Sequence, residues 1–373
     1  MSANTTDRLT RIRARMVELD LDALIINLWS NVVYATGFDG ISDIEDPHIA
    51  LVTADHAIAF IDARYYEVAS KQAVADQWEV VLARHEVRER AVETITDIVA
   101  TDRDTRSRIG IEDTMGYGTF IKWQDELDAY EIVATHRLIE EVREIKDADE
   151  IDRIDRAQAI TDKVFAQMLE FIKPGMTEQE VALELELALR RAGAEALAFA
   201  PIVAAGINGS MPHAMPSDYR IQVGDLITMD FGAQLDGYKS DMTRTICVGP
   251  ASDRQKEIYA IVAAAQQAGL DAVKADKPAI EVDNAARSVI EEAGFGEQFG
   301  HGTGHGVGLV IHEPPSLSPI SEGTLKENSL ITIEPGIYVE GELGIRIEDL
   351  VVVTPEGHRN LTRSPKELIE LQV

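Results

Sequence analysis

The sequence predicts two domains of different construction, a smaller α/β domain followed by a larger α+β domain. The chain has 373 residues, 45% of them hydrophobic, which is long for a single domain and ordinary for a globular protein. Short apolar runs alternate with amphipathic stretches in the first part. Long helical patterns begin after a charged stretch near residue 138, so we place the domains at 1–137 and 138–373.

The first domain opens with helical spacing over residues 5–19. Short apolar runs then follow at 23–26, 49–52, 57–60, 79–82 and 108–111. Amphipathic sequence between them, such as residues 86–99, indicates that strands and helices alternate, as in an open α/β domain. Residues 31–38 predict a plain strand and turn. This domain contains neither a phosphate-binding loop nor a cluster of ligand residues.

The second domain begins with a long helical pattern that reaches about Ile172. Residues 173–177 predict the end of this helix and the start of another, because Thr177 followed by Glu180 is a capping box. Helical patterns recur near 251–274 and 280–293. The domain therefore holds two successive helix pairs.

Each helix pair is followed by β-rich sequence, which indicates an internal repeat. Short identities support the repeat, since Glu180-Val181 and Ala192-Gly193 recur as Glu281-Val282 and Ala293-Gly294. The β-rich segments lie at 225–248 and 330–353. Two related halves would bring two β-hairpins together, so we expect one site formed from two distant segments.

The charge and composition exclude several classes of function. The formal net charge of −30 opposes nucleic acid binding, because phosphate contacts need clustered Lys and Arg. No segment approaches the roughly 18 apolar residues of a membrane span, and the N-terminus lacks the apolar core of a leader. The single cysteine, Cys247, excludes an intrachain disulfide and suits a reducing compartment. We expect a cytoplasmic protein with neither nucleic acid nor membrane as a partner.

Two acidic residues of the first β-rich segment lie in apolar surroundings. Asp230 ends the apolar run 226–229, where burial penalises an unpaired carboxylate by several kcal/mol, and Asp241 is expected on the returning strand. The two could chelate a metal ion. Alternatively, Asp230 accepts hydrogen bonds of a turn and Asp241 pairs with Arg244.

The second β-rich segment repeats this arrangement with two glutamates. Glu334 follows an apolar run at 330–333, and Glu348 follows another at 343–347 that is interrupted by Arg346. Carboxylates paired in an apolar wall need cations, which metal ions supply. The repeat therefore favours a metal site over solvated charge.

Three histidines lie in a glycine-rich segment, residues 300–312, which suggests a backbone that closely approaches another group. The segment contains neither the dinucleotide fingerprint G-x-G-x-x-G nor the zinc motif H-E-x-x-H. With these two motifs excluded, we interpret the histidines of this segment as residues that surround a metal ion. We expect His305 to be a ligand, and His301 and His312 to support the ligands or contact the substrate.

Several short motifs are spread over the second domain: His213, Asp230-Phe-Gly, Ser240-Asp241-Met-Thr-Arg-Thr, Gly304-His305-Gly-Val-Gly, His312-Glu-Pro-Pro, Glu334-Pro-Gly and Arg346-Ile-Glu348. Together they resemble the pita-bread metallopeptidases, the family of methionine aminopeptidase, prolidase and aminopeptidase P. The first domain resembles the creatinase-type N-terminal domain of the proline-specific members, through residues 21–24 and 34–38. Methionine aminopeptidases generally lack this domain, so the resemblance favours the proline-specific branch.

The resemblance implies a pita-bread domain with an internal pseudo-twofold repeat, acting as a homodimer on proline-containing peptides. It also implies two divalent metal ions. Asp230 would chelate one ion through both oxygens, Asp241 and Glu348 would bridge the two ions, and His305 and Glu334 would complete the ligand set. A site rich in oxygen ligands favours Mn, with Co, Fe or Zn as alternatives.

The expected reaction is hydrolysis of the peptide bond that precedes proline. Two ions that share a water lower its pKa, and Glu334 would pass a proton from this water to the leaving nitrogen. His213 and His312 would stabilise the tetrahedral intermediate, and His301 and Arg346 would hold the substrate. Dipeptides and peptide N-termini both stay open as substrates. The alternatives are a catalytically silent binding module and a metal-free creatinase-like amidinohydrolase.

Overall fold

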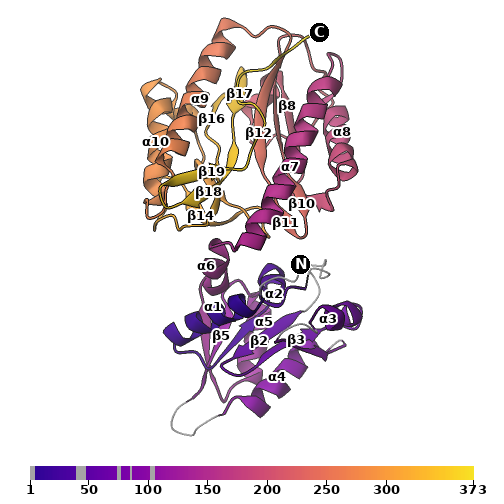
Figure 1. Cartoon of the computed structure of the whole chain (residues 1–373), viewed down its shortest axis with the longest axis vertical. Helices are drawn as coiled ribbons and strands as arrows, with labels where there is room; N and C mark the ends of the chain where they lie inside the picture. Colours follow the sequence, from indigo (N-terminus) through magenta and orange to yellow (C-terminus); the bar gives the residue numbers. More distant parts are fainter. Residues whose placement is uncertain (1–4, 39–47, 74–76, 85, 101–105) are drawn as a thin grey trace. The chain divides into compact units, whose positions relative to one another are not determined.

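The chain divides into two units, Met1–Arg143 and Glu144–Val373, in a computed structural model that describes residues 5–38, 48–73, 77–84, 86–100 and 106–373 (Figure 1). We call them unit 1 and unit 2. Helix α6 (Leu138–Glu144) spans the division, so the predicted boundary at 137/138 lies at the first residue of this helix.

Unit 1 is built on a six-stranded sheet in the order β4-β3-β2-β1-β5-β6. Its strands are β1 (Ala23–Ile26), β2 (Ile49–Thr53), β3 (Ala57–Ile61), β4 (Glu79–Leu82), β5 (Arg108–Glu112) and β6 (Glu131–Thr135). The sheet is mixed, because β1 and β3 each pair antiparallel with β2, whereas the remaining pairs are parallel. The five predicted apolar runs form β1 to β5, which confirms those strands.

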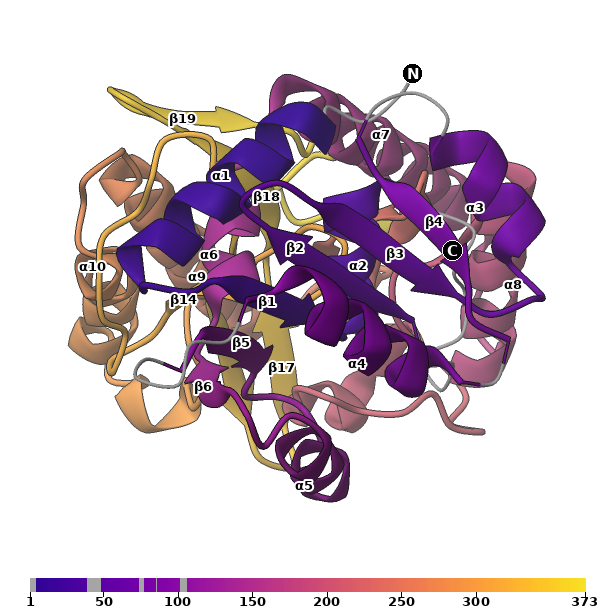
Figure 2. The same ribbon diagram turned by 90° about the horizontal axis from the view of Figure 1, so that it is seen from below.

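Helices pack on the sheet of unit 1 through their apolar sides. They are α1 (Thr5–Glu18), α3 (Tyr66–Ala73), α4 (Val87–Ile98) and α5 (Tyr117–Glu126). Figure 2 shows α4 lying across the sheet. Ala91 and Ile95 of α4 and Trp123 of α5 share one buried cluster with Ile25 and Phe60 of the sheet. The core of unit 1 therefore lies between the sheet and these two helices.

The predicted strand at residues 31–38 is wrong, because this segment forms helix α2 (Trp29–Thr36). Gly37 ends the helix in the left-handed conformation, with φ 74°, and donates its backbone N–H to the carbonyl of Val33. Most of the helix is buried, so its apolar residues show no periodic exposed face. Tertiary burial thus overrides the β propensity of Val32 and Val33.

The start of α2 is held by Glu112, a buried carboxylate at the end of β5. It accepts hydrogen bonds from the backbone N–H groups of Asn27 and Leu28 at 2.6 and 2.7 Å, and from Asn31 Nδ2 at 2.6 Å. Burial raises the pKa of Glu112 to about 7 although these donors oppose the shift. This carboxyl group therefore titrates near neutrality in the folded protein.

Unit 2 consists of two helix pairs and the sheets between them (Figure 1). Its helices are α7 (Ala148–Phe171), α8 (Glu178–Arg191), α9 (Asp253–Ala272) and α10 (Ala279–Glu292). The predicted capping box is present, because Thr177 accepts from the N–H of Glu180 and the Glu180 side chain accepts from the N–H of Thr177. We call residues 148–248 the first half and residues 253–360 the second half.

Each half contributes one principal sheet. The first half has β8 (Ile202–Ala205), β9 (Leu226–Phe231) and β12 (Met242–Val248), in the order β20-β12-β9-β8 with β20 (Glu370–Leu371). The second half has the order β14-β13-β15-β18-β19, with β13 (Gly304–Gly306), β14 (Glu313–Leu317), β15 (Leu330–Ile333), β18 (Asp349–Thr354) and β19 (Gly357–Asn360). Smaller sheets are formed by β7 (Ala196–Leu197), β10 (Ala233–Leu235) and β11 (Tyr238–Lys239), and by β16 (Gly336–Val339) and β17 (Leu343–Arg346).

The predicted pair of hairpins is present at corresponding places in the two halves. β9 pairs antiparallel with β12, with Asp230 opposite Thr243, and β15 pairs antiparallel with β18, with Ile333 opposite Asp349. The α7/α8 pair packs with the first sheet in one apolar cluster, and α9 and α10 share clusters with strands of the second half. The helices thereby bury the outer faces of the strands that contain Asp230 or adjoin the other three acids. Asp241, which was expected on the returning strand, lies one residue before β12.

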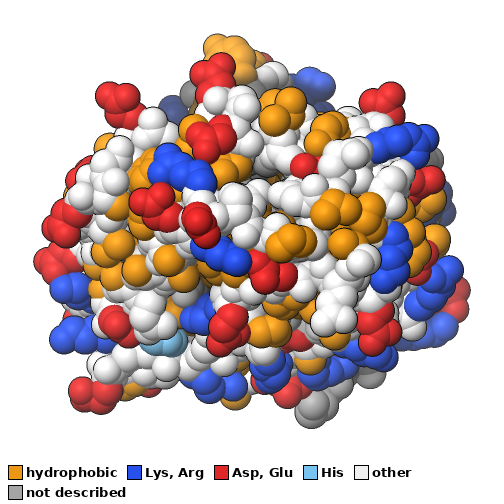
Figure 3. All heavy atoms as spheres, turned by 90° about the horizontal axis from the view of Figure 1, so that it is seen from above, with side chains coloured by type: hydrophobic (Ala, Val, Ile, Leu, Met, Phe, Trp, Pro, Cys, Tyr) orange, Lys and Arg blue, Asp and Glu red, His pale blue; other side chains and the backbone are white. Residues whose placement is uncertain are grey.

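No helix in the described residues is long and apolar enough to cross a membrane. On the face shown in Figure 3, acidic and basic side chains are interspersed among apolar ones. This mixture is typical of a solvated protein surface.

The raised pKa of Glu112 predicts that unit 1 loses stability as pH rises. Below about pH 4.5 the group is protonated in both the folded and the unfolded chain, and between about 4.5 and 7 only the unfolded chain releases the proton. Its ionisation therefore lowers the free energy of unfolding by about 3 kcal/mol across this interval. Urea unfolding at several pH values, followed by hydrogen exchange of β1 and β5 peptides, measures the effect.

In Glu112→Gln this part of the pH dependence should disappear. Glu79→Gln, at an exposed position of β4, is the matched control and should keep the wild-type slope. An unchanged slope in Glu112→Gln would show that Glu112 is not the titrating group.

Candidate metal centre

A cavity of about 490 Å³ lies in unit 2, and every predicted site residue borders it. Those residues are His213, Asp230, Asp241, His301, His305, His312, Glu334, Arg346 and Glu348. The structure thus brings together residues of both halves that are far apart in the sequence. Their proximity is a property of the fold.

Asp230 and Asp241 are brought together by a close approach of the chain at Gly232. A Cβ atom at Gly232 would lie 1.9 Å from the carbonyl oxygen of Ser240, so no larger residue fits there. Ser240 is itself fixed, because its Oγ lies 2.8 Å from Thr161 Oγ1 of α7 and accepts from the N–H of Ala233 at 2.9 Å. The glycine after Asp230 and the serine before Asp241 therefore set the separation of the two acids.

A second glycine has the same function in the second half. A Cβ atom at Gly304 would lie 2.0 Å from the carbonyl oxygen of Thr332, so only glycine lets β13 approach β15 this closely. His305 follows on β13, and its N–H donates to Thr332 Oγ1 at 3.0 Å. The same hydroxyl donates to Glu334 Oε1 at 3.1 Å. The glycine-rich segment thereby places His305 beside Glu334.

His305 directs one ring nitrogen at carboxylates of both halves. Its Nε2 lies 3.3 Å from Glu334 Oε1 and 3.5 Å from Asp241 Oδ2. Its Nδ1 lies 3.1 Å from the carbonyl oxygen of Gly306 and must donate there, because a carbonyl only accepts. Burial lowers the pKa of His305, which favours the neutral ring, whose Nε2 lone pair then faces carboxylate oxygens. Such an arrangement suits a cation between them.

The carboxylates of the cavity outnumber the positive charges beside them. Burial, and then the neighbouring acids, raise the pKa of Asp241 and of Glu348 well above their ordinary values. Asp230 Oδ1 is buried without a hydrogen-bond partner. Among the described residues that border the cavity, Arg346 is the only Lys or Arg. Four acids and one neutral imidazole therefore fit divalent cations, which this type of ligand set binds.

The tightest group of ligand atoms comes from Asp241, His305 and Glu348, which all lie within 4.8 Å of one another. Asp230 and Glu334 border the same cavity. The five predicted ligands thus consist of a central triad and one flanking acid from each half.

Arg346 connects the acids of the two halves. Its Nη2 donates to Asp230 Oδ2 at 2.6 Å, and its Nε donates to Thr243 Oγ1 at 3.0 Å. Thr243 Oγ1 in turn donates to Glu348 Oε2 at 2.7 Å. In this structure the guanidinium therefore orients Asp230 directly and Glu348 through Thr243, and a direct contact with substrate stays a prediction.

Tyr338 is a site residue that the sequence reasoning missed. Its hydroxyl accepts from Arg346 Nη1 at 2.8 Å and lies 2.9 Å from His301 Nε2. Burial raises the pKa of Tyr338 to about 12, so the hydroxyl keeps its proton at neutral pH and can donate it to His301. The only sign of Tyr338 in the sequence is that its hydroxyl is the one polar side-chain group in β16.

His213 and His312 border the cavity on its exposed side. The ring of His312 lies edge-on to that of His305, with 4.4 Å between centroids. His213 lies in the loop between η1 (Gly206–Ser210) and β9. Both are therefore placed to meet a substrate that enters the cavity.

Residues 205–217, the segment that includes His213, are held at both ends by one buried carboxylate, Glu178. It accepts from the N–H of Ala205 at 2.7 Å and from the N–H of Ser217 at 2.9 Å, and Asn208 Nδ2 donates to it at 3.1 Å. Nothing in the local sequence pattern distinguishes Glu178, because acids are common in the first turn of a helix.

The alternative pairing of Asp241 with Arg244 does not occur. Arg244 donates to Asp349 instead, on the face of the strand away from the cavity. Nor does Asp230 serve only a turn, since it pairs with Arg346. The acids of the first half are thus oriented toward the cavity.

Comparison with known families identifies the fold. Residues 152–355 match the model of metallopeptidase family M24, and residues 8–145 match the creatinase/prolidase N-terminal domain. The chain belongs to metallopeptidase family M24. The predicted creatinase-type domain followed by a pita-bread domain is thereby confirmed.

Similar M24 proteins match this chain over nearly their whole length. An uncharacterized peptidase, YqhT, of Bacillus subtilis is 39% identical over 98% of this chain and 100% of the relative. The Xaa-Pro dipeptidase of Pyrococcus furiosus is 37% identical over 97% of this chain and 99% of the relative. The solved structure of an Xaa-Pro dipeptidase from Bacillus anthracis superposes with a TM-score of 0.92 at 38% identity, covering 99% of this chain and 100% of that one. These similarities confirm the predicted resemblance to the proline-specific branch.

The crowding of carboxylates in this M24 site predicts a conflict between metal binding and stability. Asp241→Asn removes one ionisable carboxyl from this crowded group, so the chelator-treated variant should be more stable than chelator-treated wild type. Wild type should gain about 3 kcal/mol from metal at a hundred times its dissociation constant, whereas the variant should gain much less. Unfolding with chelator and with added Mn²⁺ measures both effects.

Asp218→Asn, at an exposed position outside the cavity, is the control and should behave as wild type does. A chelator-treated Asp241→Asn protein that is less stable than wild type would contradict the repulsion on which this expectation rests.

Proposed function

We propose that the protein is a metal-dependent exopeptidase that hydrolyses the bond preceding proline, in Xaa-Pro dipeptides or at peptide N-termini. The observation that carries this proposal is the cavity bordered by four carboxylates, two of which, Asp241 and Glu334, lie 3.5 and 3.3 Å from His305 Nε2. Relatives that cover nearly the whole chain are named Xaa-Pro dipeptidase, which supports the choice of substrate.

In this proposal Asp230, Asp241, His305, Glu334 and Glu348 hold two divalent ions, Mn²⁺ in preference to Co²⁺, Fe²⁺ or Zn²⁺. When bound, such ions lower the pKa of a shared water and polarise a carbonyl oxygen. Two observations support these assignments. Asp230 Oδ1 is buried without a hydrogen-bond partner, and ligand atoms of Asp241, His305 and Glu348 lie within 4.8 Å of one another. Assembly of the enzyme as a homodimer belongs to the same proposal.

Glu334 is the proposed proton carrier. Its Oε1 is held by Thr332, and burial raises its pKa, which brings its basicity closer to neutrality. Glu334 takes a proton from the attacking water and delivers it to the nitrogen of proline as the peptide bond breaks. The departing proline nitrogen needs this proton, since it leaves as an amine.

The histidines on the exposed side of the cavity stabilise the reacting carbonyl. Burial lowers the pKa of His312, so the ring is neutral near pH 7 and one of its nitrogens carries a proton to donate. His213 and His312 are proposed to donate hydrogen bonds to the oxygen that becomes negative in the tetrahedral intermediate.

The remaining wall of the cavity suits a proline-containing peptide. Apolar residues border it, including Phe199, Ile202 and Ile311, and proline offers an apolar ring without an N–H group to satisfy. His301 and Arg346 are proposed to hold the substrate, and Arg346 supplies positive charge for a peptide carboxylate. The cavity thus matches both the apolar and the charged parts of an Xaa-Pro dipeptide.

Replacing Glu334 with Gln should abolish turnover while the metal stays bound. Gln keeps one carbonyl oxygen as a ligand but cannot carry the proton, so we expect kcat to fall by about 10²- to 10⁴-fold. Xaa-Pro hydrolysis and metal content by elemental analysis are measured on the same sample. Near-normal kcat in a variant that retains its metal would contradict the assignment of Glu334 as the proton carrier. Glu322→Gln, at an exposed position, serves as the control.

Activity should depend on metal and on proline. Metal-stripped protein should be inactive, and Mn²⁺ should restore hydrolysis of Xaa-Pro or Xaa-Pro-Xaa peptides but not of matched Xaa-Ala peptides. The ratio of the two proline substrates distinguishes a dipeptidase from an aminopeptidase. Hydrolysis that survives chelation would favour a metal-free amidinohydrolase, and a folded, metal-loaded protein inactive on every peptide would favour a binding module.

A further inference from the structure

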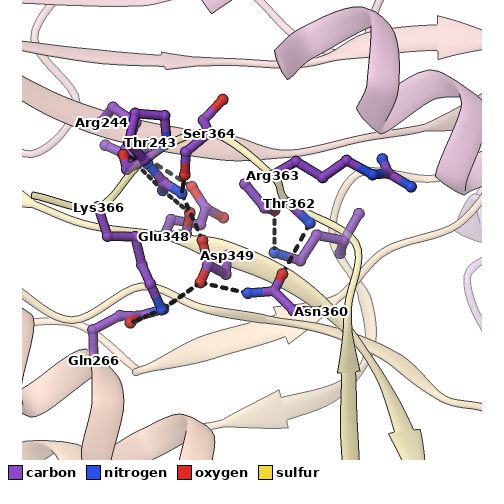
Figure 4. Close-up of polar contacts among 12 residues, drawn as sticks. Thr243, Arg244, Gln266, Glu348, Asp349, Asn360, Thr362, Arg363, Ser364 and Lys366 are labelled. Carbon is purple, nitrogen blue, oxygen red and sulfur yellow. Dashed lines mark hydrogen bonds and ion pairs between the residues drawn. The ribbon is translucent and has the colours of Figure 1, made fainter.

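A buried ion pair, Arg244–Asp349, joins the two halves of unit 2 beside Glu348, one of the candidate metal ligands (Figure 4). Arg244 Nη2 lies 2.7 Å from Asp349 Oδ1, and the two side chains are 1% and 0% exposed. Arg244 belongs to β12 of the first half, and Asp349 begins β18 of the second half. The proposed catalytic steps use neither residue.

The pair lies on the opposite side of the backbone from the cavity. Thr243 and Glu348 face each other, with Thr243 Oγ1 donating to Glu348 Oε2 at 2.7 Å, and the N–H of Glu348 donates to the carbonyl of Thr243 at 3.1 Å. Successive side chains of an extended strand point to opposite faces, so Arg244 and Asp349 meet behind them. Where β12 meets the segment at Glu348, the Thr243–Glu348 pair thus faces the cavity. The Arg244–Asp349 pair lies on the opposite side of the backbone.

The guanidinium of Arg244 uses all of its N–H donors, most of them on main-chain carbonyls. Nε donates to Pro365 at 2.9 Å, and Nη2 donates to Ser364 at 2.9 Å as well as to Asp349. Nη1 donates to the carbonyls of Thr243 and Glu348. Arg244 therefore contacts the backbone of the ligand residue Glu348 itself. A lysine ammonium lacks the planar fork that makes this set of bonds.

Asp349 is held equally firmly from other elements. Its Oδ2 accepts from Gln266 Nε2 of α9 at 3.1 Å and from Asn360 Nδ2 of β19 at 2.8 Å, and it lies 3.0 Å from Lys366 Nζ. These contacts fix the start of β18 relative to α9 and β19. The residue that follows Glu348 is thus immobilised through its side chain.

The C-terminal segment, residues 361–371, completes the arrangement. Ser364 donates through its N–H and its Oγ to Asp162 Oδ1 of α7, at 2.8 and 2.6 Å. Further along, β20 pairs with β12 through Cys247 and Glu370. The segment that contains the Ser364 and Pro365 carbonyls is therefore tied to the first half. Arg244 itself also belongs to the first half.

We propose that Arg244, together with Asp349, is a positioning residue that sets the metal affinity of the site by holding the backbone of Glu348 against the ligand strands of the first half. A buried ion pair as such adds little net stability, because desolvation offsets the attraction between the charges. The hydrogen bonds from Arg244 to the carbonyls of Thr243 and Glu348 instead let the pair fix the position of the Glu348 backbone. This inference rests on the proposed function only in taking Glu348 as a metal ligand.

The test compares the metal affinity of Arg244→Lys, Asp349→Asn and wild type, all as metal-stripped full-length protein. Arg244→Lys keeps the charge but loses the fork, and Asp349→Asn keeps the volume and one acceptor oxygen. We expect the Mn²⁺ dissociation constant, measured by competition with a chelator, to rise about 10- to 100-fold in each variant. At saturating Mn²⁺, kcat should change by a smaller factor than the dissociation constant does.

Leu185→Ala is the matched control for a purely structural effect. Leu185 is fully buried in α8 and packs in the core of the first half, so its truncation should lower the unfolding free energy by about 2–5 kcal/mol. Its Mn²⁺ dissociation constant should stay within about twofold of wild type. A loss of stability without a loss of metal affinity in the Arg244 and Asp349 variants would overturn the proposal.

The outcomes also separate this inference from the proposed function. If Arg244→Lys fails to fold, Asp349→Asn decides, because the Asn side chain can still accept from Arg244. Wild type that binds Mn²⁺ without cleaving Xaa-Pro peptides would refute the proposed function and leave the affinity comparison intact. Wild type that binds no divalent metal would refute both.

Discussion

Unit 2 is organised around the mutual repulsion of carboxylates in a buried cavity. Asp241 and Glu348 each sit among other acids, with their pKa values raised by burial and by those neighbours, and Arg346 supplies the only guanidinium at the described wall of the cavity. Such a group is unfavourable unless cations occupy it. The surrounding structure must therefore hold the acids in place before any ion arrives. This requirement explains why Thr243 holds Glu348 from the cavity side, while helices and the Arg244–Asp349 pair support the adjoining strands from behind.

The two halves meet this requirement by the same means. In each, a glycine allows a strand to approach a neighbouring carbonyl more closely than a side chain would permit, at Gly232 and at Gly304. A hydroxyl residue then fixes the result, Ser240 in one half and Thr332 in the other. Hydrogen bonds within the protein, and not solvent, thus hold the chain beside the candidate metal ligands in both halves. Preorganisation of this kind is what a binding or catalytic constellation needs in order to act without rearrangement.

The sequence predicted those features that depend on local pattern and on repetition. Asp230 and Glu334 stood out because each carboxylate follows an apolar run, and the repeat placed them at one centre. Helix α2 was missed because tertiary burial, not periodicity, determines its conformation. Tyr338 and Glu178 were missed because their importance lies in contacts with distant residues, namely His301 and the backbone of the His213 loop. The local pattern of a single sequence does not reveal which of its many polar residues will meet in the fold.

The division of the ligands between the two halves has a thermodynamic consequence. Because Asp230 and Asp241 come from one half and His305, Glu334 and Glu348 from the other, neither half alone offers the full set of donors. An ion bound at their junction adds its binding free energy to the association of the halves, in proportion to the logarithm of its free concentration. Separation of the halves would expose the repelling acids and release the ion in a single event. Under the proposed ligand assignment, the concentration of free metal ion therefore contributes to the thermodynamic stability of unit 2.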